Sequence, residues 1–321
     1  MWRALQLTDL STSIAGIKLS NPTVLASGIL GTTAHIMARV ASEGAGAITS
    51  KSASSRERKG HPNPIVVDQL KSGWMLNAVG LSNPGVEEKV NEIREYKRIV
   101  AEKKLGTPII ASVFASTAKE FGEAAETISR APPDAIELDE SCPNVEDEYG
   151  SLFCLSEKNA AKAVEEARSK VPKNIPIFAK LSPDVPAIET IARACVQAGA
   201  DGITAVNTAG PGMAIDIERA KPILANRYGG LSGPALKPLA VKSIYRIHAA
   251  LPEVPIIGTG GVFTGEDALE LMMAGACAVG IGTAAYARGP GVFKKVCAEM
   301  SEWMEAHGHS NLKEIIGKAH E

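Results

Sequence analysis

The stretch PIIGTGG (255–261) is a continuous apolar run that ends at two glycines. A run of this kind, in which apolar and polar residues do not alternate, is typical of a strand buried on both faces, as the strands of a parallel sheet are. The stretch ACAVGIG (276–282) repeats the pattern, with room for a helix between the two runs. Together they indicate a repeating unit of one parallel strand and one helix.

The same kind of run recurs along the rest of the chain, and helical spacing of apolar residues follows between runs, as at Val86, Val90 and Ile93. Eight strands alternating with helices predict a closed (β/α)8 TIM barrel, with a doubly wound open sheet as the lesser alternative. No Pro/Ser/Gly-rich linker divides the chain, so we expect a single domain over residues 1–321. The predicted strands are 23–26, 46–50, 108–113, 135–138, 176–181, 202–207, 255–260 and 276–282.

Composition excludes several classes of protein. A formal net charge of −2, with no clustered basic face, argues against a nucleic-acid partner. No window approaches the roughly 18 apolar residues of a membrane span, and the start lacks a signal-peptide pattern, so we expect a cytoplasmic protein. The five cysteines contain no C-x-x-C pair, which argues against a disulfide framework and against a local zinc or iron–sulfur site.

Three strand-to-helix connections are much longer than such links usually are: about 51–85, 142–155 and 207–234. Long loops at the carboxyl ends of barrel strands are where this architecture carries its chemistry. The active site is therefore expected at that end of the barrel.

Glycines end the last two predicted strands, at Gly260-Gly261 and at Gly282-Thr283. Each alone is most simply a tight turn. Together they match the place where barrels of this kind bind phosphate through backbone N–H groups, so we expect a phosphorylated cofactor there.

Two lysines stand at strand ends: Lys51 after the second strand and Lys180 inside the fifth. A lysine in an apolar strand is rarely buried without a partner, so the pair suggests an anion or an electron-rich ring at the barrel mouth. Amide side chains in the long loops, with Thr208 beside the last of them, predict a polar pocket for a flat, amide-bearing ligand. These amides are Asn77, Asn144 and Asn207.

Cys142 begins the loop after the fourth strand. A thiol at this place can act as a nucleophile or as a proton-abstracting base. No histidine lies at a strand end, which disfavours a Cys–His hydrolase. Asp139 is the sole acid expected in position, so we predict no metal site.

A series of ordered motifs runs through nearly the whole chain: NPTVLASG (21–28), ITSKS (48–52), MLNAVGLSNPGVE (75–87), SCPN (141–144), AKLSP (179–183), VNT (206–208), GMAIDI (212–217), GGLSGPALKPLA (229–240), IIGTGGV (256–262) and VGIGTA (279–284). These motifs resemble those of the class 1 dihydroorotate dehydrogenases. MLNAVGLSNPGVE and GMAIDI most resemble the class 1B branch.

This resemblance implies that FMN binds across the barrel mouth, that dihydroorotate is oxidised to orotate in pyrimidine biosynthesis, and that Cys142 removes the C5 proton while hydride leaves C6 for flavin N5. It also implies a partner subunit carrying FAD and a 2Fe-2S cluster, and a homodimeric core. The implied FMN contacts are Ala26, Ser27, Lys51, Ser52, Lys180, Ser232, Gly233, Gly260, Gly261, Gly282 and Thr283. The implied substrate contacts are Lys51, Asn77, Asp139, Asn144, Asn207 and Thr208.

One departure from the family pattern leaves the substrate open. Asp139 stands where the family usually has asparagine, and Glu140 where it has an apolar residue. An ionised aspartate only accepts hydrogen bonds and repels a ligand carboxylate, so another dihydropyrimidine such as dihydrouracil is an alternative substrate.

Two hypotheses from different classes of protein also remain open. They are a flavin-free phosphate-binding lyase or isomerase with a Lys180 Schiff base, and a non-catalytic subunit. The electron acceptor is open among NAD⁺, fumarate, a quinone and an unidentified acceptor. Because the chain shows no NAD fingerprint or cluster ligands of its own, NAD⁺ would require the partner subunit.

Overall fold

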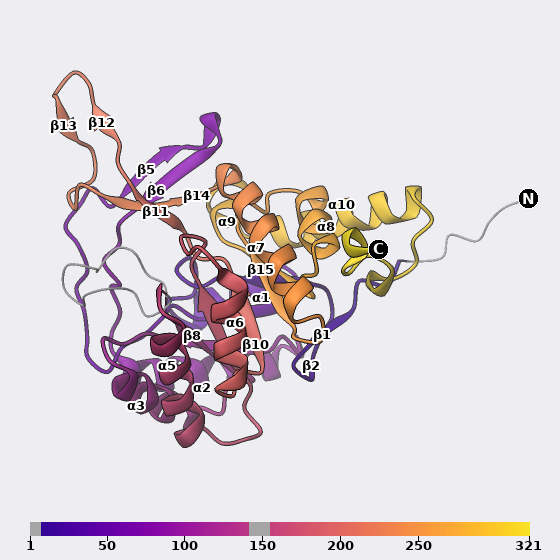
Figure 1. Ribbon diagram of the computed structural model, residues 1–321, viewed down its shortest axis with the longest axis horizontal. Helices are drawn as coiled ribbons and strands as arrows, with labels where there is room; N and C mark the ends of the chain where they lie inside the picture. The colour runs from indigo at the N-terminus through magenta and orange to yellow at the C-terminus, as the bar shows by residue number, and fades with distance from the viewer. Residues whose placement is uncertain (1–7, 141–154) are drawn as a thin grey trace, which may run out of the picture.

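Eight parallel strands close into a barrel in the order in which they occur in the chain, which confirms the predicted (β/α)8 architecture. The computed structural model describes residues 8–140 and 155–321 (Figure 1). Each predicted apolar run forms a strand whose ends lie within two residues of the expected ends. The barrel strands are β3 (Thr23–Leu25), β4 (Ala47–Thr49), β7 (Ile109–Val113), β8 (Ala135–Asp139), β9 (Ile177–Leu181), β10 (Gly202–Ala205), β15 (Ile256–Thr259) and β16 (Ala278–Ile281).

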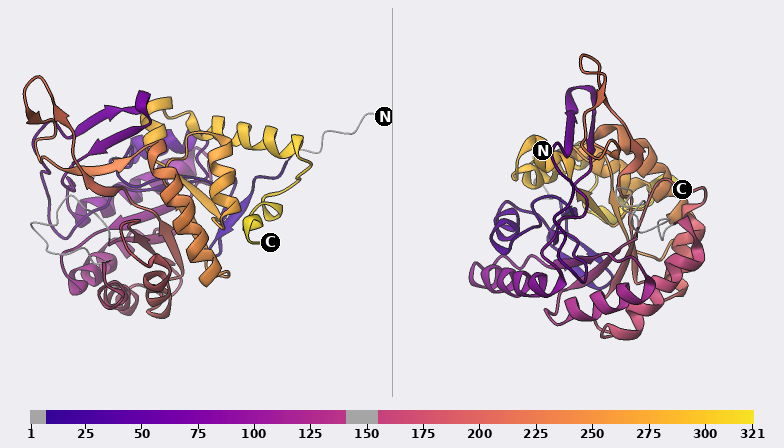
Figure 2. Two further views of the ribbon diagram at one scale, coloured as in Figure 1. Left: turned by 45° about the horizontal axis from the view of Figure 1, so that its top comes forward. Right: turned by 90° about the vertical axis from the view of Figure 1, so that its left-hand side faces the viewer.

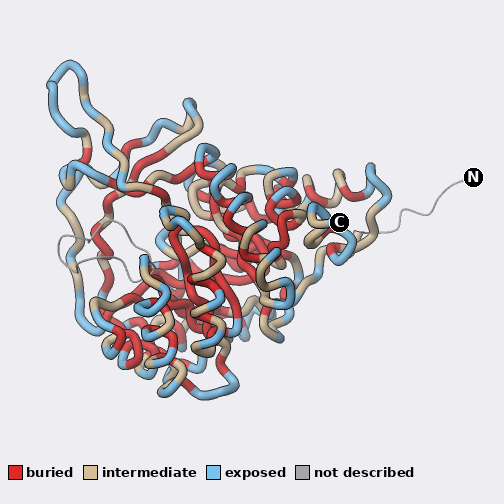
Figure 3. Tube along the Cα trace, viewed as in Figure 1, coloured by how far each residue is buried: buried red, intermediate tan, exposed pale blue. Residues whose placement is uncertain are grey.

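Helices surround the barrel and bury one face against it (Figure 2). The spacing of apolar residues accounts for this: Val90 and Ile93 of one helix, and Ala163 of another, are fully or almost fully buried. In Figure 3 the buried segments follow the barrel and the inner sides of the helices. The helices are α1 (Ala34–Ser42), α2 (Val86–Glu102), α3 (Ala118–Ser129), α5 (Glu157–Lys170), α6 (Ile188–Gln197), α7 (Lys237–Ala250), α8 (Gly265–Met273), α9 (Thr283–Arg288) and α10 (Val292–Ala306).

A short antiparallel hairpin, β1 (Thr12–Ile14) and β2 (Ile17–Leu19), packs at the amino end of the barrel. Ile14 and Leu19 of this hairpin belong to the same buried hydrophobic cluster as Phe178 of the barrel strand β9. Apolar side chains therefore fill this end, and the carboxyl end remains for a ligand.

The two long connections 51–85 and 207–234 are not irregular, as a loop would be. They contribute a four-stranded antiparallel sheet in the order β11-β14-β6-β5, and the hairpin β12–β13 projects from it (Figures 1 and 2). These strands are β5 (Val66–Gln69), β6 (Trp74–Asn77), β11 (Ala209–Gly212), β12 (Ile215–Asp216), β13 (Lys221–Pro222) and β14 (Gly229–Ser232).

The third long connection, 142–155, lies almost entirely outside the described residues. Within residues 8–140 and 155–321, none of the helices combines the length and the apolar character needed to cross a lipid bilayer.

Candidate functional site

A cavity of about 270 Å³ lies at the carboxyl ends of the barrel strands, between them and the extra sheet. Every predicted site residue that the structure describes lines this cavity. Cys142 and Asn144 lie outside the described residues. The predicted residues in the lining are Ala26, Ser27, Lys51, Ser52, Asn77, Asp139, Lys180, Asn207, Thr208, Ser232, Gly233, Gly260, Gly261, Gly282 and Thr283.

Strand geometry places the charged side chains of the wall together. Asp139 and Lys180 are paired residues in the register of β8 and β9. Side chains two residues apart on a strand share a face, so Glu137 projects to the same side as Asp139. A lysine and two acids therefore meet in a small volume.

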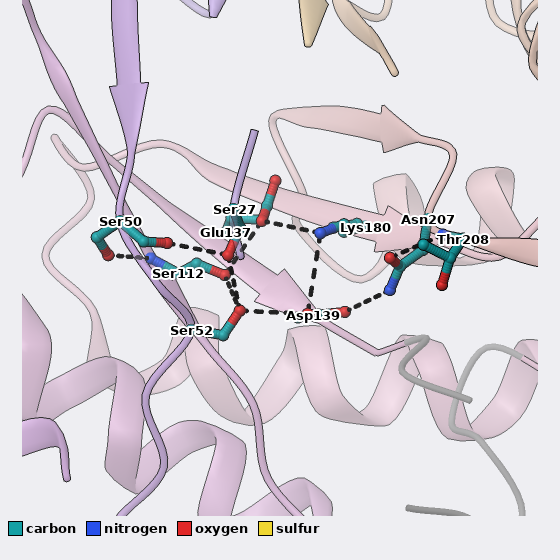
Figure 4. Close-up of polar contacts among 9 residues, drawn as sticks. All are labelled: Ser27, Ser50, Ser52, Ser112, Glu137, Asp139, Lys180, Asn207 and Thr208. Carbon is teal, nitrogen blue, oxygen red and sulfur yellow. Dashed lines mark hydrogen bonds and ion pairs between the residues drawn. The ribbon is translucent and has the colours of Figure 1, made fainter. Parts of the chain in front are cut away.

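Lys180 forms the centre of this charged group (Figure 4). Its Nζ lies 3.8 Å from Glu137 Oε1 and 3.9 Å from Asp139 Oδ2, and the side chain of Lys180 is only 7% exposed. Burial raises the pKa of the Glu137 carboxyl, while the charge of Lys180 opposes that rise. The two carboxyl groups offset a positive charge that would be costly to bury alone.

The expectation that Asp139 is the sole acid in position was wrong, because Glu137 is the second. Glu137 lies within the run AIEL (135–138), where its neighbours marked a buried strand. The sequence did carry one signal for Glu137, a single acid within an apolar strand. A buried acid, like the buried Lys180, needs a partner of opposite charge.

Serine hydroxyls link the ends of three strands beside the charged group. Ser27 Oγ is hydrogen-bonded to Ser52 Oγ at 2.9 Å, and Ser52 Oγ to Ser112 Oγ at 2.9 Å. Ser112 Oγ donates to Glu137 Oε1 at 3.1 Å. Ser112 was not predicted, because a serine inside an apolar strand carries no pattern of its own.

The amide of Asn207 connects the opposite side of the site to Asp139. Asn207 Nδ2 donates to Asp139 Oδ1 at 3.1 Å, and the backbone N–H of Thr208 donates to Asn207 Oδ1 at 2.9 Å. Asn77 reaches the cavity from β6, where its Nδ2 donates weakly to the Gly230 carbonyl at 3.4 Å. Amide groups from the loop after β10 and from β6 of the four-stranded sheet thus converge on one cavity.

The glycine turns after β15 and β16 form the other end of the cavity. Gly260 and Gly261 adopt φ of 128° and 76°, and a Cβ on Gly261 would lie 2.5 Å from Lys237 Cβ. Among the described residues, the backbone N–H groups of Gly261 and Val262 have no hydrogen-bond acceptor. Free N–H groups on a glycine turn fit an anionic group such as a phosphate.

Thr283 and Ser232 add hydroxyls at this end, where Thr283 Oγ1 donates to Ser232 Oγ at 3.0 Å. Phe263 and Tyr286 also line the cavity and were not predicted. Phe263 lies in the loop between β15 and α8, and Tyr286 lies in the short helix α9, so neither belonged to a periodic pattern long enough to mark it. The donor groups, the lysines and the aromatic rings together fit a phosphorylated, planar cofactor such as FMN.

The match to known proteins covers nearly the whole chain. The family model described as dihydroorotate dehydrogenase matches residues 9–304. The protein named dihydroorotate dehydrogenase B (NAD(+)), catalytic subunit, from Methanocaldococcus jannaschii is 44% identical over 315 residues, which are 97% of this chain and 98% of that protein. Proteins of the same name from Methanosarcina mazei (44% over 314 residues; 96% of this chain, 95% of that protein) and Geobacter sulfurreducens (41% over 318 residues; 98% and 99%) are similar over comparable lengths. The chain therefore belongs to the dihydroorotate dehydrogenase family.

Proposed function

We propose that this chain is the FMN-binding catalytic subunit of a dihydroorotate dehydrogenase, which oxidises dihydroorotate to orotate in pyrimidine biosynthesis. One observation carries the proposal: two lysines, two amide side chains and two glycine turns, drawn from strands far apart in the chain, line a single cavity. Relatives that are similar over nearly their whole length bear the name of this catalytic subunit.

FMN is assigned to the cavity with its phosphate at the turns of Gly260, Gly261, Gly282 and Thr283. When bound, FMN supplies a two-electron acceptor for the hydride that leaves C6 of the substrate. Lys180 would supply a positive charge beside bound FMN, which favours its reduced form. Ser27 and Ser52, which line the same cavity, would be further contacts of the cofactor.

The substrate is assigned to Lys51, Asn77, Asn207 and Thr208, with Asn144 as a further contact. In this assignment Lys51 meets the substrate carboxylate, and the amides bind the ring N–H and C=O groups. Cys142, three residues after Asp139 in the chain, removes the C5 proton as a general base. This base assignment depends on the SCPN motif (141–144).

Asp139 supports a second candidate substrate. Because a carboxylate in the lining opposes a second carboxylate on the ligand, a neutral dihydropyrimidine such as dihydrouracil is the alternative. NAD⁺ is the proposed final acceptor, reached through a partner subunit with FAD and a 2Fe-2S cluster, since the relatives' names specify NAD(+).

The test is anaerobic reduction of the FMN-loaded protein. Dihydroorotate is expected to bleach the visible absorbance of the flavin, and dihydrouracil to do so much more slowly. Cys142→Ala should slow bleaching by on the order of 100-fold or more with FMN still bound. Cys297→Ala, at a partly buried helix position in α10, is the matched control and should react as the wild type does.

Two results would contradict the proposal at different points. A protein that neither carries nor takes up flavin overturns the whole assignment. Undiminished bleaching of Cys142→Ala overturns only the role of the thiol.

A further inference from the structure

Asp139 lies in the cavity wall and is 7% exposed. Its two oxygens face donors from three different elements (Figure 4). Oδ1 accepts from Asn207 Nδ2 at 3.1 Å, and Oδ2 accepts from Ser52 Oγ at 3.2 Å. Lys180 Nζ lies 3.9 Å from Oδ2. Both oxygens of Asp139 therefore act as hydrogen-bond acceptors.

This arrangement sets the direction of the hydrogen bonds around Asp139. An asparagine at this position could turn its amide to donate or to accept, whereas a carboxylate only accepts. Asn207 must therefore present Nδ2 to Asp139, and its Oδ1 is occupied by the backbone N–H of Thr208. A ligand that reaches this wall meets an acceptor at Asp139.

The charge of Lys180 is offset within the wall. Its Nζ lies 3.8 Å from Glu137 Oε1 and 3.9 Å from Asp139 Oδ2, so both carboxyl groups interact with the same ammonium. Among the described lining residues, Lys51 is the other side chain with a positive charge. A ligand carboxylate is thus attracted on the Lys51 side and repelled on the Asp139 side.

We infer that Asp139 is a specificity-determining residue of this site. It accepts a hydrogen bond from a ring N–H of the pyrimidine, fixes the ring with that N–H toward β8, and weakens the binding of pyrimidines that carry a carboxylate relative to those that do not. The inference rests on the proposed function, because it takes the ligand to be a pyrimidine bound beside FMN.

The test compares the equilibrium binding of two products, orotate and uracil, to the oxidised FMN-loaded protein. Binding is followed by the perturbation of the flavin spectrum and by calorimetry, neither of which requires turnover. The measured quantity is the ratio of the uracil Kd to the orotate Kd. Both ligands are titrated into the same preparation, so a misfolded fraction does not affect the ratio.

Asp139→Asn is expected to raise this ratio about tenfold, because orotate binds more tightly once the repulsion is removed, while uracil gains nothing. Asp139→Ala removes the charge without offering a new donor and should raise the ratio in the same direction. Asp216→Asn is the matched control: it removes the same charge on the projecting hairpin, where Asp216 accepts from backbone N–H groups, and should leave the ratio unchanged.

A ratio within about twofold of wild type in both Asp139 variants overturns the inference. A rise of equal size in Asp216→Asn also overturns it, because overall charge would then be the cause. If the FMN-loaded wild type binds neither pyrimidine, the proposed function fails and the inference fails with it. If it binds orotate and the ratio does not move, only the inference fails.

Discussion

Lys89 is a third buried lysine near the site, besides Lys51 and Lys180. It is fully buried in the first turns of α2, and its Nζ donates to the Thr32 carbonyl at 2.7 Å. Burial lowers the pKa of Lys89 to about 8; the charge of Lys51 acts in the same direction, and Glu92 opposes it. Lys89 therefore anchors the loop that follows β3, whose Gly31 carbonyl in turn accepts from the backbone N–H of Lys51.

The shift at Lys89 predicts a pH-dependent stability. Below pH 8 Lys89 is protonated in both the native and the unfolded chain, so the native state bears the full free-energy cost of burying the charge. From about pH 8 to 10.5 the native state releases the proton first, so the unfolded state binds more protons and stability rises with pH. The free energy of unfolding of the wild type should therefore gain roughly 2 to 3 kcal/mol relative to Lys89→Met over this range.

Urea unfolding at several pH values measures this difference. Lys119→Met is the control, because Lys119 is exposed on α3 and 78% of its side chain is accessible. Its difference from wild type should stay constant with pH. A constant difference for Lys89→Met as well would mean that Lys89 has no depressed pKa in the native state.

At the scale of elements, the turn after β15 depends on close approach to the start of α7. Gly261 has φ of 76°, and its ideal Cβ would lie 2.5 to 2.8 Å from backbone and side-chain atoms of Lys237. The helix cannot move without disturbing the ion pairs of Lys237 with Asp267 and Glu270. Glycine is therefore required both for the turn and for the position of its N–H groups.

Gly261→Ala is expected to weaken FMN binding by about tenfold or more, because the turn must shift away from Lys237. Gly106→Ala is the matched control: it has a similar φ of 64°, but no atom lies within 4 Å of its added Cβ. It should cost about 1 kcal/mol of stability through backbone strain and leave FMN affinity unchanged. Titration of the flavin-free variants with FMN measures the two dissociation constants. Equal FMN affinities for Gly261→Ala and Gly106→Ala would contradict the prediction that close contact with Lys237 requires glycine at 261.

At the scale of the molecule, the barrel is filled at one end and carries its cavity at the other. The hairpin β1–β2 and Phe178 fill the amino end, and the sheet of β5, β6, β11 and β14 stands over one side of the mouth. Because the amino end is filled and the cavity lies at the carboxyl end, we expect an electron-transfer partner subunit to dock near the carboxyl end.

The chain alone is accordingly expected to pass electrons from dihydroorotate to a small dye but to reduce NAD⁺ at a rate at least about 100-fold lower. Addition of an electron-transfer subunit carrying FAD and a 2Fe-2S cluster should restore NAD⁺ reduction without changing the rate with the dye. Following NADH absorbance with and without that subunit checks this. Rapid NAD⁺ reduction by the chain alone would show that no partner is needed.

The barrel and most of the site were predictable from local pattern. Each buried parallel strand is a short apolar run, and its end marks a position at the barrel mouth, so the order of residues along the chain was enough to place Lys180, Asp139 and Gly260 there. The homodimeric core and the roles of Cys142 and Asn144 stay predictions.

The extra sheet was not predictable, because β6 pairs with β14, more than 150 residues away in the chain. Which side chains share charge was likewise decided by tertiary structure. Glu137 and Asp139 both form ion pairs with Lys180 because β8 and β9 pair in a particular register. Asn207 directs its amide toward Asp139 because β10 ends close to these two strands. Run length and polarity are properties of neighbouring residues, whereas a hydrogen bond between positions 68 apart exists only after the barrel has closed.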